Sequence, residues 1–404
     1  MTDKTSSAAI GADGTLTGGE SLVETLIAQG VDTIFGLPGI QLDGLFNALH
    51  GAQDRLRVIH TRHEQATAYM ADGYARVTGK EGVCVVVPGP GALNAAAGLS
   101  TAYSCNSPVL CVTGQIRSDL IGKNRGALHE ITDQLGMFRS VTKWADRPDT
   151  ASDVGGTVEE AFRQLRTGRM RPVAIEVAPD VLTSTGGRVG RADTSRVRFG
   201  GDPDLLAKAA KTLGEAKNPV IMAGGGVERS GASGELRRVA ELLEAPVLKT
   251  SHGKGALTDR HYLAQNGLLS GEFLPKADVV VILASRFPDP AGWQWYPAPG
   301  QQVIQIDIDR TEFGKFGPAT LNIEGDARPT LAALADLIPA HNRKRASREA
   351  ELLPIKQAFQ KKIETIEPQA GYGLAIRAEL PDDGILVGEF TQVGYWSYLG
   401  YDDY

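Results

Sequence analysis

The stretch at residues 62–94 combines one carboxylate with a loop built from glycine and proline. Glu64 lies in Arg-His-Glu-Gln at residues 62–65, where an extended run changes into a helical pattern. Residues 88–91 read Pro-Gly-Pro-Gly between an apolar run and a second helical pattern. A carboxylate in this place can move a proton during a reaction. It can also be structural, because an acidic residue in the first turn of a helix is stabilised by about 0.3–1 kcal/mol.

The loop at residues 88–91 lies between a strand and a helix, where backbone N–H groups and the helix dipole favour an anion. It does not match the dinucleotide fingerprint, because the sequence continues to Asn94 without a third glycine. A tight turn without a ligand is the other interpretation. The Gly-Lys pairs at residues 79–80 and 253–254 are followed by Glu81 and Gly255, so neither is a nucleotide-binding P-loop.

Four titratable side chains occur in two close pairs. His60 and His63 are three residues apart, but they span a strand-to-helix junction and no His-Glu-x-x-His pattern follows, so zinc is not predicted. His129 and Glu130 are adjacent in Ala-Leu-His-Glu-Ile. This second pair can exchange protons with a substrate or can be a solvated loop, and the residues leave both interpretations open.

The bulk composition indicates an ordinary globular protein. The chain has 404 residues, of which 42% are hydrophobic and 22% charged, and this length favours two to three domains. A formal net charge of -6 without a clustered basic face argues against nucleic-acid binding. Residues 1–15 lack the apolar segment of a secretory signal, and the longest apolar run, residues 279–284, is too short to cross a bilayer. We therefore expect a cytoplasmic protein with no membrane partner.

The three cysteines do not resemble a metal site or a disulfide framework. Cys84, Cys105 and Cys111 are odd in number, have no Cys-x-x-Cys spacing and lie in apolar runs. We expect buried thiols in a reducing compartment, and no metal-ligating residue is predicted.

Short apolar runs alternate with helical patterns through the first half of the chain. Leu42, Leu45, Phe46 and Leu49 form one helical stripe. Continuous apolar runs are typical of strands that are buried on both faces of a parallel sheet. Strands are predicted at residues 31–35, 56–60, 83–87, 109–113 and 173–177. The pattern predicts a doubly wound domain at residues 14–185, followed by a linker at residues 184–201 that is rich in Gly, Arg, Ser and Thr.

A second series of the same kind predicts another doubly wound domain at residues 202–338. Its strands are predicted at residues 220–223, 247–250, 279–283 and 303–308. Residues 341–365 are charged and helical in pattern, which predicts an interdomain helix. A third unit begins at residue 368, with a helix at residues 375–380 and a strand at residues 384–387. Residues 368–404 are too few for an independent α/β domain, so this segment either packs on the others or is the start of something longer.

Three motifs in order carry a resemblance to a known family. Arg-His-Glu-Gln at residues 62–65, Ala-Asp-Gly-Tyr-Ala-Arg at residues 71–76 and Pro-Gly-Pro-Gly-Ala-Leu-Asn at residues 88–94 resemble the pyrimidine-binding domain of thiamine diphosphate enzymes. The nearest group is acetolactate synthase and benzoylformate decarboxylase.

The resemblance implies a role for each of these motifs. Glu64 would share a proton with the aminopyrimidine ring, whose imino tautomer generates the ylid. Gly89, Asn94 and the Pro38-Gly39 turn would line the pyrimidine pocket, because backbone approaches a flat ring only where no side chain intervenes.

The same resemblance extends to the later segments, with departures. In acetolactate synthases the place of His129 and Glu130 resembles a Phe-Gln pair near the reacting centre, so this chain differs there. The second domain resembles a central domain that holds FAD in acetolactate synthases and other nucleotides, or none, in relatives. Pro288 and Pro290 follow the Arg-Phe pair in place of charged residues, which leaves FAD open. The candidate nucleotide-binding residues, each at or just beyond the end of a predicted strand, are Gly225, Thr250, Ser251, Arg286 and Asp307.

Family members bind magnesium through a Gly-Asp-Gly motif in a third domain, and this sequence has no such motif. The resemblance therefore implies that Mg would be held through the missing part of the third domain and that this chain carries half of the cofactor site. It also implies a homodimer or homotetramer with the site at the interface.

We expect a thiamine diphosphate-dependent lyase or transferase that acts on small 2-oxo acids. The alternative is a non-catalytic nucleotide-binding or regulatory protein that lost the third domain. A nicotinamide oxidoreductase ranks last, because it rests on the doubly wound pattern alone. The overall expectation is an α/β chain with two parallel-sheet domains and the start of a third.

Overall fold

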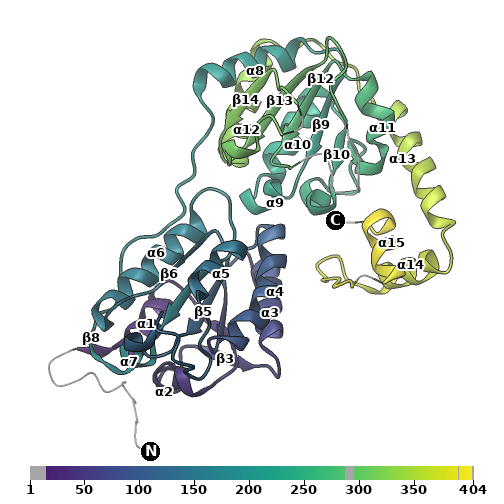
Figure 1. Ribbon diagram of the computed structural model, residues 1–404. Coiled ribbons are helices and arrows are strands. Elements are labelled where there is room, and N and C mark those ends of the chain that lie inside the picture. Colours follow the sequence, from purple (N-terminus) through teal and green to yellow (C-terminus); the bar gives the residue numbers. More distant parts are fainter. Residues whose placement is uncertain (1–14, 287–294, 316, 390, 403–404) are drawn as a thin grey trace, which may run out of the picture. The chain divides into compact units, whose positions relative to one another are not determined.

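The chain divides into two compact units between Val197 and Arg198. The computed structural model describes residues 15–286, 295–315, 317–389 and 391–402 (Figure 1). Each unit is built around a six-stranded sheet in which every neighbouring pair of strands is parallel. The predicted α/β class with two doubly wound parallel sheets is confirmed.

The sheet of unit 1 has the strand order β3-β2-β4-β5-β7-β6. The strands are β2 (Thr33–Gly36), β3 (Arg57–His60), β4 (Gly82–Val86), β5 (Val109–Gly114), β6 (Trp144–Asp146) and β7 (Val173–Val177). The sequence predicted five of them. It missed β6, whose three residues, Trp-Ala-Asp, are too few to give an apolar run.

Helices cover both faces of this sheet, as Figure 1 shows. One face is covered by α1 (Gly18–Ala28), α2 (Asp43–Gly51), α6 (Val154–Arg166) and α7 (Pro179–Thr183), and the other by α3 (Glu64–Thr78), α4 (Pro90–Cys105) and α5 (Gln134–Val141). Alternate residues of β4 serve the two cores: Val83 and Val85 pack with the first group, and Cys84 and Val86 with the second. Both faces are buried, so the apolar run is continuous.

The segment predicted as a linker at residues 184–201 does not begin as one. Its first part forms β8 (Thr185–Gly187), which pairs antiparallel with β1 (Leu16–Thr17). Gly187 makes this possible, because a Cβ there would lie 2.7 Å from the carbonyl oxygen of Thr17. The chain then stays on unit 1, where Arg166 Nη1 donates a hydrogen bond to Thr194 Oγ1 at 2.7 Å.

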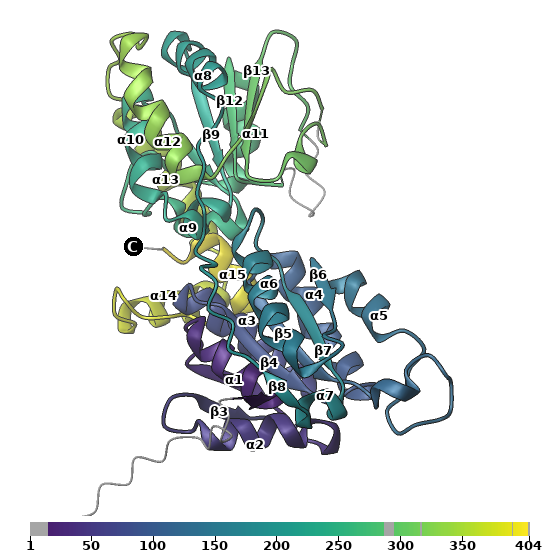
Figure 2. The same ribbon diagram turned by 90° about the vertical axis from the view of Figure 1, so that its left-hand side faces the viewer.

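The sheet of unit 2 has the strand order β11-β10-β9-β12-β13-β14. The strands are β9 (Pro219–Ala223), β10 (Val247–Lys249), β11 (Ala264–Asn266), β12 (Val279–Leu283), β13 (Gln302–Asp307) and β14 (Leu321–Glu324). The two outer strands, β11 and β14, were missed because they are short and carry polar residues. The helices are α8 (Pro203–Glu215), α9 (Gly226–Ser230), α10 (Ser233–Leu243), α11 (Ser270–Phe273) and α12 (Ala327–Leu337), with α10 beside α12 in Figure 2.

Unit 2 ends with three helices: α13 (Glu349–Glu364), α14 (Gln369–Glu379) and α15 (Gln392–Gly400). They share a small core of Ile363, Ala370, Trp396 and Tyr401. The strand predicted at residues 384–387 is wrong, since these residues form neither strand nor helix. No described strand pairs with them, and Val387 is 84% exposed. A β-branched run alone does not make a strand without a hydrogen-bonding neighbour.

The cysteines follow the expectation in two of three cases. Cys84 and Cys111 are buried and opposite each other in β4 and β5, whereas Cys105 is only half-buried, and all three are free thiols. The contact with Cys84, together with burial, raises the pKa of the Cys111 thiol. Within the described ranges no helix has both the length and the apolar character needed to cross a membrane.

Two glycines in the helix pair α3 and α4 give opposite predictions. A Cβ at Gly98 would lie 2.7 Å from Ala68 Cβ, whereas a Cβ at Gly73 would meet nothing within 4 Å. We expect Gly98→Ala to destabilise unit 1 by about 1–3 kcal/mol through overpacking. Gly73→Ala should stabilise it by about 0.5–1 kcal/mol, because alanine loses less conformational entropy in a helix. Urea unfolding followed by circular dichroism measures the free energy of unfolding of both variants. Equal changes in the two variants would contradict the close contact of Gly98 with Ala68.

Candidate functional site

The candidate residues of unit 1 gather at the carboxyl edge of its sheet. Strands β3, β2 and β4 are neighbours, and each is followed at this edge by a turn, at residues 61–63, 37–39 and 87–89. The edge beyond the carboxyl ends of parallel strands is where open α/β sheets bind ligands. The fold thus brings together three segments that are up to 52 residues apart in sequence.

Glu64 is the first residue of α3, and its carboxylate is not used to cap that helix. His63 does the capping instead, because its Nδ1 accepts the backbone N–H of Gln65 at 3.2 Å. Glu64 is half-buried and turns toward α4, where Asn94 Nδ2 donates to Glu64 Oε2 at 3.0 Å. Within the described ranges no hydrogen bond reaches the other oxygen, Oε1. One carboxylate oxygen is held and the other is available to a ligand.

The two histidines near Glu64 serve the fold. His60 stacks on Phe46 with ring centroids 6.3 Å apart, and His63 caps α3. In the part of the chain that the structure describes, no group of three or more His, Cys, Asp or Glu is placed to hold a metal ion.

Three glycines beside Glu64 occupy positions that exclude any side chain. Gly89 has φ 59° and ψ -116°, and a Cβ there would lie 2.4 Å from the carbonyl oxygen of His129. A Cβ at Gly39 would lie 2.3 Å from Val87 Cγ1, and one at Gly91 2.5 Å from Val87 Cγ2. The side chain of Val87, in the turn after β4, therefore packs between Gly39 and Gly91. The exposed Pro38 precedes Gly39 in the turn after β2.

His129 lies next to this glycine loop. Its backbone has a φ of 70°, in the left-handed region, and its carbonyl contacts Gly89. Its ring Nδ1 lies 3.2 Å from Gln41 Oε1, and Gln41 Nε2 donates to the carbonyl oxygen of Leu128 at 3.3 Å. The structure therefore brings His129 into contact with Gly89 and Gln41.

Glu130 is occupied by its own loop. Its carboxylate accepts the backbone N–H groups of Ala127 at 2.9 Å and Arg125 at 3.3 Å. These hydrogen bonds lower the pKa of Glu130 below its ordinary value, so the carboxyl is ionised at neutral pH. A direct part in proton transfer stays a prediction for Glu130.

Two residues of this region were missed in the sequence. Gln134 Oε1 accepts the N–H of Gly89 at 2.8 Å, while Gln134 Nε2 donates to the carbonyl oxygen of Gly114 and to Glu176 Oε2, both at 2.9 Å. Glu176 is 1% exposed, and its Oε1 receives Arg147 Nη1 at 2.7 Å. Burial raises the pKa of Glu176, although Gln115, Gln134 and Arg147 oppose this. A glutamate inside the apolar strand Val-Ala-Ile-Glu-Val was the available signal.

The candidate residues of unit 2 lie at the carboxyl edge of the second sheet. They are more widely spread along that edge than the candidate residues of unit 1. Gly225, Thr250 and Ser251 follow β9 and β10, which are neighbours, and a Cβ at Gly225 would lie 2.6 Å from the carbonyl oxygen of His252. Asp307 ends β13, with β12 between it and β9, and accepts the N–H of Asp309 at 2.9 Å. Arg286 is exposed, and Pro288 and Pro290 lie outside the described residues.

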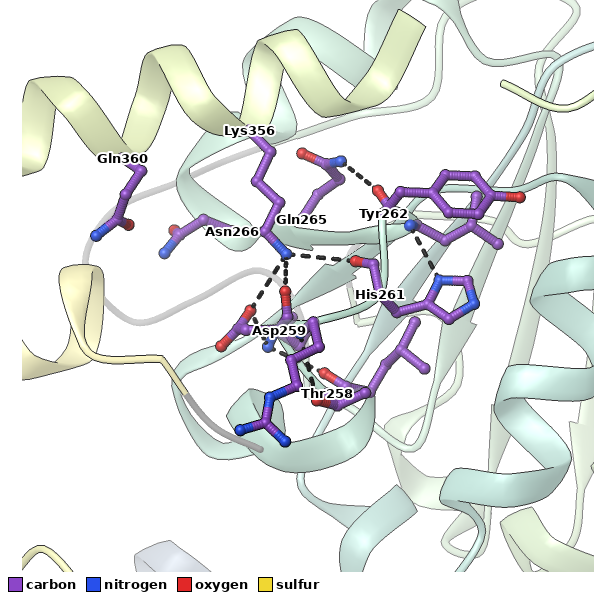
Figure 3. A network of polar contacts seen from close by, with 12 residues as sticks. Thr258, Asp259, His261, Tyr262, Gln265, Asn266, Lys356 and Gln360 are labelled. Atoms are coloured by element: carbon purple, nitrogen blue, oxygen red, sulfur yellow. Dashed lines mark hydrogen bonds and ion pairs between the residues drawn. The ribbon is translucent and has the colours of Figure 1, made fainter. Parts of the chain in front are cut away.

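Thr250 and Ser251 open onto a cavity of about 180 Å³, which is also lined by Lys356, Phe359 and Tyr398. Figure 3 shows Lys356 reaching from α13 toward Asp259 and His261, where it donates to the carbonyl oxygen of His261 at 3.3 Å. Pockets for drug-sized ligands measure about 300–1,000 Å³. The space is therefore small, and Lys356 in its lining joins α13 to the segment between β10 and β11.

Comparisons with known proteins identify the family. Residues 16–137 match the family model for the thiamine pyrophosphate enzyme, N-terminal TPP binding domain, and residues 206–334 match the one for its central domain. A probable 2-ketoarginine decarboxylase of Pseudomonas aeruginosa is 33% identical over 388 residues, which cover 94% of this chain and 69% of that protein. The chain belongs to the thiamine pyrophosphate enzyme family. The resemblance carried by the three sequence motifs is confirmed.

Other members of the thiamine pyrophosphate enzyme family are similar over a shorter stretch. A probable acetolactate synthase large subunit of Methanocaldococcus jannaschii is 38% identical over 337 residues, 78% of this chain and 55% of that protein. The acetolactate synthase isozyme 3 large subunit of Escherichia coli is 34% identical over 338 residues, 80% of this chain and 58% of that protein. The chain thus spans little more than half the length of these two relatives.

The lowered pKa of Glu130 predicts a pH-dependent stability. In the folded chain its pKa lies below the ordinary value of 4.5, so its stabilising contribution is complete above that pH and is lost as the pH falls through the folded pKa. We expect Glu130→Gln to be less stable than the wild type at neutral pH, with the difference shrinking on acidification. Urea unfolding at several pH values measures this. A stability difference between the two proteins that does not change with pH would contradict the lowered pKa of Glu130.

Proposed function

We propose that this chain acts in a thiamine diphosphate-dependent decarboxylase or carboligase that uses a 2-oxo acid. The observation that carries the proposal is the Glu64 carboxylate, held through one oxygen by Asn94 beside a turn lined with glycine. The names of the relatives, 2-ketoarginine decarboxylase and acetolactate synthase, support an enzyme over the non-catalytic alternative.

The residues present fit the pyrimidine half of the cofactor. Gly39, Gly89 and Gly91 allow the two loops to pack closely against Val87 and His129 beside Glu64, because a Cβ at any of them would collide with one of those two residues. Glu64 Oε1 is then the polar group that a flat heteroaromatic ring would meet in this cradle. We propose that these residues, with Pro38 and Asn94, hold the aminopyrimidine ring.

When it is bound, thiamine diphosphate supplies the electron sink for the pair released as a 2-oxo acid loses CO₂. Glu64 would hold a proton at a ring nitrogen of the pyrimidine and return it during each cycle. Asn94 holds Oε2 through its hydrogen bond, so Oε1 is the oxygen that would carry the proton. We propose that His129, whose backbone contacts Gly89, exchanges a proton with the substrate.

We assign magnesium and FAD no residue of this chain. Magnesium requires several oxygen ligands at close distance, and the described ranges offer no cluster of them. The cavity next to Thr250 and Ser251 measures about 180 Å³, below the range of about 300–1,000 Å³ that is usual for ligand pockets. The predicted nucleotide-binding residues stay a prediction: Gly225, Thr250, Ser251, Arg286 and Asp307.

Exposed apolar side chains around the site support an assembly of identical chains. Ile40 and Leu128 are each 67% exposed and adjoin Gly39 and His129, while Leu93 is 49% exposed and Tyr69 43%. Apolar groups that gather around a polar site mark a surface for a partner. We propose that a second copy of the chain covers this edge, in a homodimer or a homotetramer.

Replacing the proposed proton carrier should separate turnover from binding. In a form of the protein that includes the magnesium-binding part of the third domain, we expect Glu64→Gln to lower kcat for 2-oxo acids, including 2-ketoarginine, by about 10²- to 10⁴-fold. Calorimetry with thiamine diphosphate and magnesium should show that binding is largely kept, because the amide has the same shape.

The matched control is Glu81→Gln, which weakens an ion pair with Arg166 at the other end of β4. Near-normal turnover in the Glu64 variant would rule out the proposed role. Loss of turnover in both variants would point to general destabilisation.

A charge in the apolar surface should disrupt the assembly. We expect Leu93→Glu to shift the chain toward monomers in sedimentation equilibrium, because each interface would bury an unpaired carboxylate. Val197→Glu, at a side chain 83% exposed in the segment between the units, is the control and should leave the mass unchanged. A wild-type chain that stays monomeric at all concentrations would refute the proposed assembly.

A further inference from the structure

A buried chain of polar contacts ends on the glycine loop. It runs from the Arg147 guanidinium through the Glu176 carboxylate and the Gln134 amide to the N–H of Gly89, with distances of 2.7, 2.9 and 2.8 Å. Gln134 is 2% exposed and Glu176 1% exposed. These contacts join β7 and α5 to the turn that follows β4, across more than 40 residues of sequence.

The direction of each hydrogen bond in this chain is determined by its two ends. The N–H of Gly89 can only donate, so it requires the oxygen of the Gln134 amide. The Gln134 nitrogen must then donate, and it finds two acceptors, the carbonyl of Gly114 and the carboxylate of Glu176. An ionised carboxylate accepts through both oxygens, so Glu176 meets the donor of Gln134 on one side and the donor of Arg147 on the other.

The loop that receives this contact also carries the groups next to Glu64. Gly89 is the N-cap of α4, and Gly91 and Asn94 lie in the first turns of that helix. Asn94 donates to Glu64 Oε2, and a Cβ at Gly91 would lie 3.5 Å from Glu64 Cγ. A displacement of Gly89 therefore changes both the floor of the proposed pyrimidine pocket and the hydrogen bond that orients Glu64.

We propose that Glu176 and Gln134 are positioning residues, which hold the glycine loop in the shape that accepts the pyrimidine ring of the cofactor. This inference rests on the proposed function. Glu176 acts through Gln134 because it selects the amide orientation in which oxygen faces Gly89. Neither side chain reaches the ring itself, since Gly89 and its neighbours lie between.

Substitution of Glu176 by glutamine tests this orientation with almost no change in volume. The new amide keeps one oxygen, and Arg147 can only donate, so that oxygen stays with Arg147. The new NH₂ group then faces the NH₂ group of Gln134. The two NH₂ groups repel each other. A flip of the Gln134 amide removes this repulsion, but it places the NH₂ group of Gln134 against the N–H of Gly89.

Hydrogen–deuterium exchange of the peptide spanning residues 86–95 measures the loop without requiring catalysis. We expect Glu176→Gln to raise exchange in this peptide by about tenfold or more, because the Gly89 amide loses its acceptor. In the assembled enzyme the variant should also bind thiamine diphosphate about 10- to 100-fold more weakly. Glu81→Gln again serves as the control, and it should alter thermal stability without raising exchange at residues 86–95.

The outcomes distinguish this inference from the proposed function. Unchanged exchange and cofactor affinity in Glu176→Gln, with only a lower Tm, would show a purely structural role and overturn the inference. If the variant loosens the loop but thiamine diphosphate fails to protect the loop in the wild type, the proposed function fails and the link to the cofactor is overturned with it.

A second variant, Arg147→Met, keeps the test decisive if Glu176→Gln does not fold. Arg147 is 28% exposed at its side chain, so a linear apolar residue can replace it. Of the groups that contact the Glu176 carboxylate in the described structure, Arg147 is the charged one, and Gln115 and Gln134 are amides. Removing this donor leaves Glu176 Oε1 without its charged partner, so the carboxylate and the Gln134 amide are held less firmly and exchange at residues 86–95 should rise. Exchange equal to that of the wild type would overturn the inference.

Discussion

The site of unit 1 depends on three glycines that let neighbouring groups approach the backbone more closely than a Cβ allows. At Gly39, Gly89 and Gly91, an added carbon would lie within 2.5 Å of Val87 or of the carbonyl of His129. Such approaches are possible because each turn follows one of two neighbouring parallel strands, whose register fixes where the turns begin. The half-buried carboxylate of Glu64 is placed by the same geometry, since it faces Gly91 and Asn94 across the gap between α3 and α4.

Each unit contains a buried ion pair that ties a loop to its sheet. In unit 1 Glu176 pairs with Arg147, and in unit 2 Lys249 Nζ lies 2.6 Å from Asp259 Oδ1, with the lysine side chain 5% exposed. Pairs of this kind add little net stability compared with apolar residues of similar volume. Their main effect is therefore on specificity: they allow one arrangement of the loop and penalise the others.

The sequence predicted most of the architecture and the local part of the site. Continuous apolar runs identified the central strands of both sheets, and the motifs around Glu64 and Gly89 identified the edge where the candidate residues gather. The outer strands β11 and β14 were missed because short polar segments give no apolar run. The strand expected at residues 384–387 failed because β propensity cannot supply a partner strand. Gln134 and Glu176 were missed because their contacts with each other and with Gly89 are long-range.

The facing thiols of Cys84 and Cys111 can report on the separation of the central strands of unit 1. Both lie in central strands with no exposed surface, and neither is bridged. A thiol reagent reaches them only when the strands separate, so their rate of alkylation follows the equilibrium of that event rather than local fraying. The half-buried Cys105, at the end of α4, supplies an internal reference on the same polypeptide.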